Sequence, residues 1–87
     1  MAGTTDRVSG SASYDNLIAA LATARLSVQM SQRGLSSKLG KAPTFVSKIE
    51  RGERMLGIVE LFQVCGALGV DALTLLNDTF GKVKADG

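Results

Sequence analysis

Residues 30–53, MSQRGLSSKLGKAPTFVSKIERGE, decide the fold, because this stretch predicts two short helices separated by a tight turn. Ser31 is a favourable N-cap for the first helix, since its side-chain oxygen can accept a backbone N–H of the first turn. Leu35 and Leu39 share one helical face, and Gly40 follows where helices often end in a left-handed residue. Two helices this short are not stable alone, so the rest of the chain must act as their scaffold.

The turn contains Pro43, the single proline of the chain, which lacks an N–H and biases the preceding residue away from helical geometry. We expect the second helix over residues 44–51, with Val46 and Ile49 facing the scaffold and Gly52 ending the helix. The opposite face of this helix is then left to contact a partner.

The flanking sequence predicts three further helices, over residues 14–28, 58–68 and 71–80. In each helix, apolar residues recur at the three- and four-residue spacing of a buried helical face. The residues expected to face inward are Leu17, Ile18, Leu21, Ala24 and Val28, then Ile58, Leu61, Phe62, Cys65 and Leu68, and finally Leu73, Leu76 and Phe80. Ser13 and Asp71 are suitable caps for the first and last of these helices. No strand pattern competes, so the expected fold class is all-α, with five helices in one bundle.

Residues 14–80 are expected to form one domain with a flexible tail at each end, residues 1–13 and 81–87. Gly, Ser, Thr and Ala dominate the first tail, which shows no apolar period, and the second tail is polar. The chain of 87 residues is near the size at which one core suffices without disulfides or metals. Because 45% of the residues are hydrophobic but only 5% are aromatic, the core is expected to be aliphatic.

The composition argues against several classes of protein. Cys65 is the only cysteine, so no internal disulfide can form, and a reduced cytoplasmic setting is expected. The chain has no histidine and no cluster of ligands around Cys65, so we expect neither a metal site nor a cofactor. No apolar run reaches the ~18 residues of a membrane span, and no signal peptide is recognisable, so no membrane partner is expected. The sequence also lacks paired carboxylates in a plausible cleft and a phosphate-cradling loop, so we do not expect an enzyme.

The net charge is only +2, but the charge is unevenly distributed. From Arg25 to Arg54 the chain carries seven basic and two acidic residues, whereas the remainder carries three basic and six acidic residues. A basic centre between acidic flanks favours a localised polyanion-binding face. A solvated helical surface could have the same composition, so charge alone does not decide between the two.

The middle of the chain resembles the Xre/Cro/C1-type helix-turn-helix family of bacterial and phage repressors. The matching residues are Ser31-Gln32, Leu35, Leu39-Gly40, Val46 to Arg54 (VSKIERGER) and Ala67 to Asp71 (ALGVD). The similarity covers about residues 14–80 and implies a helix-turn-helix formed by the second and third of five helices. It implies a transcriptional regulator, a repressor, that binds a palindromic double-stranded DNA operator as a homodimer. It also implies a cytoplasmic protein, encoded by a bacterium or a phage, that associates with the nucleoid when bound to DNA.

The resemblance assigns the second helix of the unit, residues 44–51, to the DNA major groove. The residues expected to face bases are Pro43, Thr44, Phe45, Ser47 and Lys48, and those expected to face phosphates are Gln32, Arg33, Lys41, Arg51 and Arg54. Lys48 can donate to guanine or to a phosphate, and the hydroxyl groups of Thr44 and Ser47 can bond base edges or phosphates. In the family, the glutamine that matches Gln32 binds a phosphate beside the helix N-terminus. For Phe45, partial burial against the scaffold is the open alternative.

Arg25 and Glu50 are expected to form a structural ion pair. In the repressor family, an arginine of the first helix pairs with a glutamate near the end of the reading helix, and both positions match here. Arg25 lies beside the inward stripe of its helix, where a charged group needs a carboxylate partner. A direct DNA contact by Arg25 is the alternative.

Three positions depart from the family pattern. Many relatives carry glutamine at the position of Pro43 and use it to read adenine, a contact that proline cannot make. Gly34 replaces a helix-forming residue, at a cost of about 1 kcal/mol. Gly57 stands in place of a common aspartate cap, so the fourth helix is expected to start less firmly. The operator sequence therefore cannot be copied from a relative.

Two other functions remain compatible with the sequence. An antitoxin-like autoregulator would use the short tails to bind a protein partner, whose identity is unknown. A protein-interaction module that keeps the fold without DNA binding would account for Pro43. For the homodimer, the candidate surfaces are Met55-Leu56 and the last helix with Leu75, Leu76 and Phe80, although Leu76 fits the core better.

Overall fold

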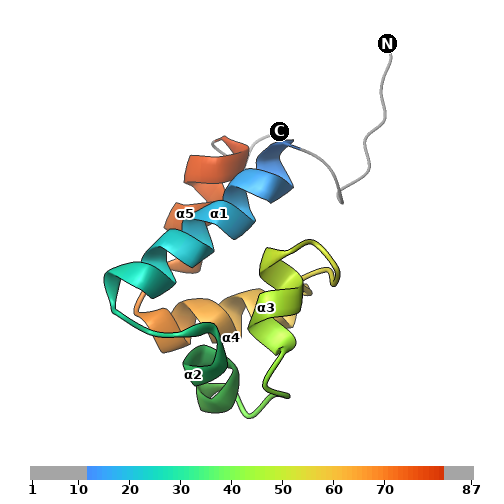
Figure 1. Ribbon diagram of the computed structural model, residues 1–87. Helices are drawn as coiled ribbons and strands as arrows, with labels where there is room; N and C mark the ends of the chain where they lie inside the picture. The colour runs from blue at the N-terminus through green and yellow to red at the C-terminus, as the bar shows by residue number, and fades with distance from the viewer. Residues whose placement is uncertain (1–11, 82–87) are drawn as a thin grey trace.

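The computed structural model describes residues 12–81, which form five α-helices (Figure 1). The helices are α1 (Ala12–Ser27), α2 (Gln32–Lys38), α3 (Phe45–Glu50), α4 (Ile58–Leu68) and α5 (Ala72–Phe80). This part of the chain contains no strand, which confirms the all-α class. Most of the two expected tails, residues 1–11 and 82–87, lies outside the described residues.

The helix starts differ in how their first backbone N–H groups are capped. Ser13 lies inside α1, which corrects its expected role as a cap. Asp71 caps α5 as expected, because its Oδ2 accepts the Thr74 N–H at 2.9 Å. α4 starts after Gly57, where Glu60 Oε1 accepts the Gly57 N–H at 2.9 Å. Glycine has no side chain with which to return this bond, so α4 has only half of a capping box.

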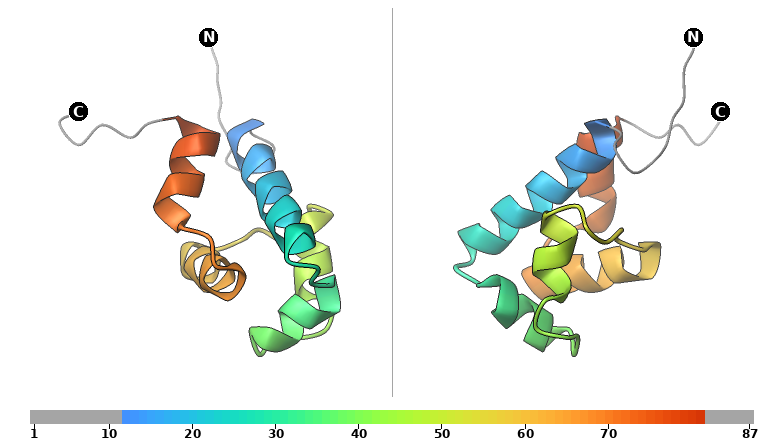
Figure 2. Two further views of the ribbon diagram at one scale, coloured as in Figure 1. Left: turned by 90° about the vertical axis from the view of Figure 1, so that its left-hand side faces the viewer. Right: turned by 45° about the vertical axis from the view of Figure 1, so that its right-hand side comes forward.

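The helices are arranged so that three of them support the other two. Figure 2 shows α1 and α5 side by side at one end of the molecule, with α2 and α3 at the other. α4 packs against α1, α2 and α5, and α3 packs against α1 and α2. The short α2–α3 unit therefore rests on α1 and α4, which supply the scaffold that it needs.

The core is aliphatic, as the composition predicts. Leu35 and Cys65 are each only 2% exposed, so the lone cysteine is a small buried hydrophobic residue. Burial is also the main reason that the pKa of the Cys65 thiol is raised. The buried apolar residues are Tyr14, Leu17, Ile18, Leu21, Leu35, Phe45, Val46, Ile49, Leu61, Val64, Cys65, Leu68, Ala72 and Leu75.

Several apolar residues that periodicity places inward are exposed instead. They are Val28, Ile58, Phe62, Leu73 and Phe80, between 46% and 64% exposed. α4 carries apolar residues on more than one face, so periodicity cannot select the face that meets the scaffold. Val28 lies beyond the end of α1, and Arg25 occupies the last buried position of that helix.

The connection between α1 and α2 contains a left-handed residue that is not glycine. Gln29 has a φ of 58°, while its N–H donates to Leu26 O at 2.9 Å and the Met30 N–H donates to Arg25 O at 3.1 Å. This pair of bonds is a Schellman motif, in which the left-handed position favours glycine. α2 ends in the same way at Gly40, with a φ of 72°, as the sequence predicts.

No single helix within residues 12–81 is long and apolar enough to cross a membrane. α4 and α5 together reach that length and composition, but their axes are bent by 115° at the break between them. The inner faces of both helices lie in the protein core.

Candidate nucleic-acid interface

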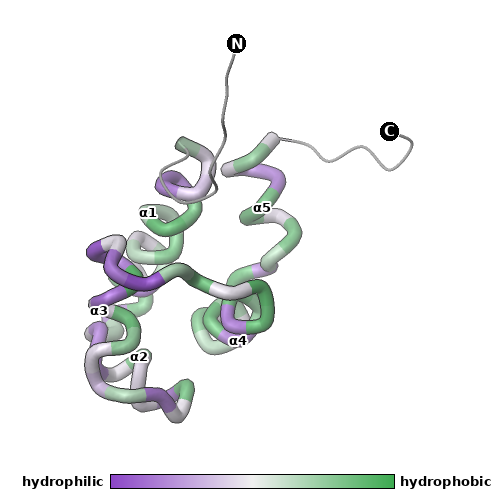
Figure 3. Tube along the Cα trace, turned by 90° about the vertical axis from the view of Figure 1, so that its right-hand side faces the viewer, coloured by the Kyte–Doolittle hydropathy of each residue, from purple (hydrophilic) through white to green (hydrophobic). Residues whose placement is uncertain are grey.

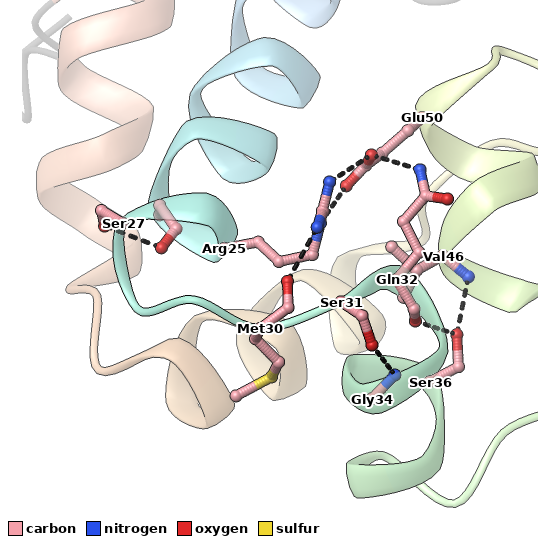
Figure 4. A network of polar contacts seen from close by, with 10 residues as sticks. Arg25, Ser27, Met30, Ser31, Gln32, Gly34, Ser36, Val46 and Glu50 are labelled. Carbon is pink, nitrogen blue, oxygen red and sulfur yellow. Dashed lines mark hydrogen bonds and ion pairs between the residues drawn. The ribbon is translucent and has the colours of Figure 1, made fainter.

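α2 starts as the sequence predicts. Ser31 has an extended backbone, with φ −76° and ψ 163°, and its Oγ accepts the Gly34 N–H at 2.9 Å (Figure 4). A Cβ at Gly34 would lie 3.0 Å from the same oxygen, closer than ordinary van der Waals contact. A larger residue at this position would therefore require a small shift of the Ser31 side chain.

Pro43 shapes the start of α3. The Phe45 N–H donates to Ala42 O at 3.0 Å, and Thr44 has φ −97° and ψ 5°. These values match a type I turn with proline at its second position, where the fixed φ of proline is favourable. The helix proper begins at Phe45 and ends at Glu50, one residue inside each end of the expected range 44–51.

The outward face of α3 is polar. Pro43, Thr44, Lys48 and Arg51 are exposed, and Ser47 is half-buried, with its hydroxyl donating to Thr44 O at 3.1 Å. Positions 44, 47, 48 and 51 follow the spacing of one helical face. The structure thus brings Thr44, Ser47 and Lys48 together on one side of α3. Figure 3 shows that hydrophilic residues gather around α3 and the segment after it, whereas α4 and α5 carry hydrophobic stretches.

Phe45 does not belong to that face. Its side chain is 7% exposed and packs in the core with Val46 and Ile49, so the expectation that it faces DNA bases is wrong. The spacing of Phe45 and Ile49 is the four-residue spacing of one helical face. This spacing already favoured burial of the ring. The outward placement of Phe45 came instead from assigning Val46 and Ile49 to the scaffold side and leaving Phe45 on the opposite face.

Arg25 and Glu50 meet between α1 and α3, with their side chains 9% and 16% exposed. Arg25 donates from Nε to Glu50 Oε2 at 2.9 Å and from Nη2 to Oε1 at 3.0 Å (Figure 4). The third arginine nitrogen, Nη1, donates to Met30 O at 2.8 Å. A planar guanidinium suits this bidentate geometry, and the fixed geometry holds the C-terminal end of α3 to α1.

Gln32 joins the same cluster. Its Nε2 donates to Glu50 Oε1 at 2.8 Å, a contact that the sequence analysis did not anticipate (Figure 4). The side-chain amide has a second N–H, and Gln32 remains half-buried at the start of α2. Gln32 therefore already supports α3 with the side chain that was expected to bind a phosphate.

Ser36 is a further residue that the sequence analysis missed. It is fully buried, and its hydroxyl donates to Gln32 O at 2.9 Å while accepting the Val46 N–H at 3.0 Å. One hydroxyl thus joins α2 to α3 and satisfies an N–H in the first turn of α3, which has no partner within its own helix. The signal in the sequence was the position of Ser36 beside Leu35 on the inward face of α2.

The predicted phosphate-binding cations fall into two groups. Arg33 and Lys41 line an open hollow with Pro43 beside the turn between α2 and α3. Arg51 and Arg54 are exposed, but each is already bonded to a carboxylate. Arg51 and Arg54 are therefore distinguished from Arg33 and Lys41 by their carboxylate partners.

Arg51 pairs with Glu53 and Arg54 pairs with Glu60, at 2.9 and 2.8 Å. The hydrogen bond between Arg51 and Glu53 raises the pKa of Arg51 and lowers the pKa of Glu53. Glu60 accepts bonds from Arg54 and from the Gly57 N–H, and these donors lower the pKa of its carboxyl to about 2. Both carboxylates are therefore charged at neutral pH.

Among residues 12–81, no group of three or more His, Cys, Asp or Glu side chains is arranged to hold a metal ion. A family model described as "Helix-turn-helix" matches residues 21–75, more than half of the chain. The match spans α2, the turn, α3 and α4 completely, together with parts of α1 and α5. No curated protein matches the chain.

Proposed function

The chain belongs to the Xre/Cro/C1-like helix-turn-helix family, a family of DNA-binding regulators that are typically not enzymes, and we propose that it is a sequence-specific repressor. In this proposal, α3 enters the major groove of double-stranded DNA and a homodimer reads a palindromic operator. The observation that carries the proposal is the polar outward face of α3, presented by a helix whose buried end is fixed to α1.

The residues on this face suit base recognition. Lys48 donates to guanine O6 and N7, and the Thr44 and Ser47 hydroxyls bond base edges or phosphates. Pro43 is exposed at the start of the helix, where it can touch a thymine methyl group. Phe45 is removed from the set of base contacts, because its ring is buried.

Phosphate contacts would position the domain on the duplex. Arg33 and Lys41 offer positive charge beside the turn, and Gln32 lies at the N-terminus of α2. Arg51 contributes its charge less strongly because Glu53 neutralises it locally. The operator DNA of a bacterium or a phage lies in the bacterial cytoplasm, so this proposal places the protein there.

The homodimer would use the apolar residues that the scaffold leaves exposed. Leu75 is buried and is therefore withdrawn from the dimer surface, and Leu76 packs against the core. The exposed large apolar residues of α4, of α5 and of the segment before α4 are Met55, Ile58, Val59, Phe62, Leu73 and Phe80. A second copy that covered them would double the number of base contacts on one palindrome.

Selection of bound duplexes from a random DNA pool tests the proposal. We expect enriched sequences with two symmetric half-sites about one helical turn apart. Lys48→Ala should weaken binding to the enriched site by about 1–3 kcal/mol and relax the preference at one base pair. Lys38→Ala is the matched control, because Lys38 lies on α2 with its Nζ 3.3 Å from Ala67 O, directed at α4. Binding without enrichment of any site would contradict sequence specificity, and an absence of all duplex binding at ~50 mM salt, where non-specific binding is strong, would contradict DNA binding altogether.

A protein-interaction module is the second candidate. Two of the expected phosphate-binding residues, Arg51 and Arg54, are bonded to carboxylates, and Pro43 has no side-chain donor. The same binding experiment separates the two functions, since an interaction module would bind no duplex at low salt. An antitoxin-like autoregulator would bind both DNA and a protein partner.

A further inference from the structure

The N-terminal end of α3 is covered by two cations. Phe45, the first residue of α3, has a ring that is almost completely buried. Arg54 Cζ lies 4.9 Å from the ring centroid, and Lys41 Nζ lies 5.4 Å from it. Both distances are within the range of a cation–π interaction. The ring is thus the point where the turn, α3 and the segment after α3 come together.

Arg54 is fixed in place by the start of α4. Its Nη1 donates to Glu60 Oε1 at 2.8 Å and to Met55 O at 3.1 Å, and its Nη2 donates to Glu60 Oε2 at 2.9 Å. Glu60 is itself held, because it accepts the Gly57 N–H at 2.9 Å. A continuous set of contacts therefore runs from α4 through Glu60 and Arg54 to the Phe45 ring.

These contacts leave Arg54 poorly suited to hold a phosphate. A guanidinium has five N–H groups, and three of those of Arg54 already donate within the protein. The Glu60 carboxylate cancels its charge at hydrogen-bond distance and would repel an approaching phosphate. Arg51 differs, because its partner Glu53 is 53% exposed, and within residues 12–81 these two side chains form hydrogen bonds only with each other.

We propose that Arg54 and Glu60 are positioning residues that fix the N-terminal end of α3 through the Phe45 ring, and that Arg54 is not a phosphate ligand. The proposal rests on the proposed DNA-binding function for its effect on operator recognition. In a helix of six residues, a small rotation at this end moves Thr44 and Ser47, so the loss of the pair reduces specific binding more than non-specific binding.

Two binding measurements distinguish a positioning residue from a phosphate ligand. Arg54→Gln and Glu60→Gln should each weaken binding to the selected operator by about 2- to 10-fold, and the double variant should be no weaker than either single variant. The slope of log affinity against log salt should stay unchanged, whereas loss of a phosphate ligand would reduce it by about 0.9. Glu60→Gln binding that equals or exceeds wild-type binding would overturn the proposal, because it would mean that the carboxylate only masks Arg54.

Glu53→Gln is the matched control, since it removes the carboxylate of an equally short Arg–Glu pair that does not touch Phe45. It should leave operator binding unchanged or tighter. Thermal melts of all variants identify any loss that comes from unfolding.

Amide hydrogen exchange on the unbound protein tests the same proposal without DNA. Arg54→Gln and Glu60→Gln should speed exchange at Phe45 and Lys48, whose N–H groups bond Ala42 O and Thr44 O. Glu53→Gln should not. Unchanged exchange rates in Glu60→Gln would overturn the positioning role, whether or not the wild-type protein binds DNA. Failure of the wild-type protein to bind any duplex would instead contradict only the proposed DNA-binding function.

Discussion

The two ends of α3 are held by ion pairs of the same geometry in different surroundings. At the C-terminal end, Arg25 and Glu50 are 9% and 16% exposed and share further bonds with Met30 O and Gln32. At the N-terminal end, Arg54 is 43% exposed and Glu60 is 17% exposed. Both pairs are bidentate, so geometry alone does not distinguish them.

Solvent decides what each pair contributes. Removing one partner from a buried pair leaves the other charge without compensation, which costs about 3–5 kcal/mol. An exposed pair is screened by water and contributes about 1 kcal/mol or less. The buried pair therefore controls whether the domain folds, and the exposed pair can control only the position of one helix end.

Breaking the buried pair should have the largest effect. We expect Arg25→Ala to lower the free energy of unfolding by about 3–5 kcal/mol, and to weaken DNA binding with it. Urea denaturation measures this loss. Arg33→Ala is the control, because Arg33 is exposed on α2, and it should change stability by less than about 0.5 kcal/mol. An Arg25→Ala protein that unfolds at the same urea concentration as the parent would contradict the structural role.

The next largest effect is expected at the hydroxyl that joins α2 to α3. Ser36→Ala would leave the Val46 N–H buried without its partner, at a cost of about 1–3 kcal/mol in unfolding free energy. Ser37→Ala is the matched control, since Ser37 is exposed on the same helix. Equal midpoints for the two variants in thermal unfolding would argue against the role of Ser36.

The exposed pair can be tested by pH. The Glu60 carboxyl has its pKa lowered from 4.5 to about 2 in the folded protein, so it stabilises the fold above pH 4.5. That contribution is lost as the pH falls from 4.5 towards 2. Glu60→Gln should therefore be less stable than wild type by about 1 kcal/mol or less at neutral pH. The difference should shrink as the pH falls through about 2, and a difference that stayed constant over this range would show that packing, not charge, is responsible.

The smallest effect should have the opposite sign. Gln29 precedes Met30, whose carbonyl accepts Arg25, and it holds a φ of 58° that costs an L-residue more than glycine. Gln29→Gly should raise the unfolding free energy by about 0.5–1 kcal/mol, after allowance for the greater freedom of glycine in the unfolded chain. Calorimetry would detect the increase. A lower melting temperature would mean that the Gln29 side chain makes a contribution of its own.

Local features of the fold could be predicted from the sequence because they depend on neighbouring residues. Ser31, Gly40 and Asp71 were placed correctly at helix ends, since caps and left-handed turns bond groups only a few residues apart. The family resemblance extended this to one distant contact by bringing Arg25 to Glu50. Phe45 was misplaced for a different reason, because the inward face of its helix was assigned too narrowly and left this bulky, buried side chain on the outward face.

Contacts between distant residues could not be predicted in the same way. These contacts are the hydrogen bonds of Gln32 with Glu50, of Ser36 with Val46 and of Arg54 with Glu60. No regular spacing along the sequence identifies these partners in advance. The exposed positions of Ile58 and Phe62 were missed for a related reason, since α4 is apolar on more than one face.

The sequence by itself determined five helices, several of their ends and the helix-turn-helix family, because periodicity, capping and motif spacing are properties of short segments. Only the tertiary structure decided which polar groups meet, which apolar face is buried and how each end of α3 is held. These outcomes depend on how the helices dock against one another, and docking brings together side chains that are far apart along the chain.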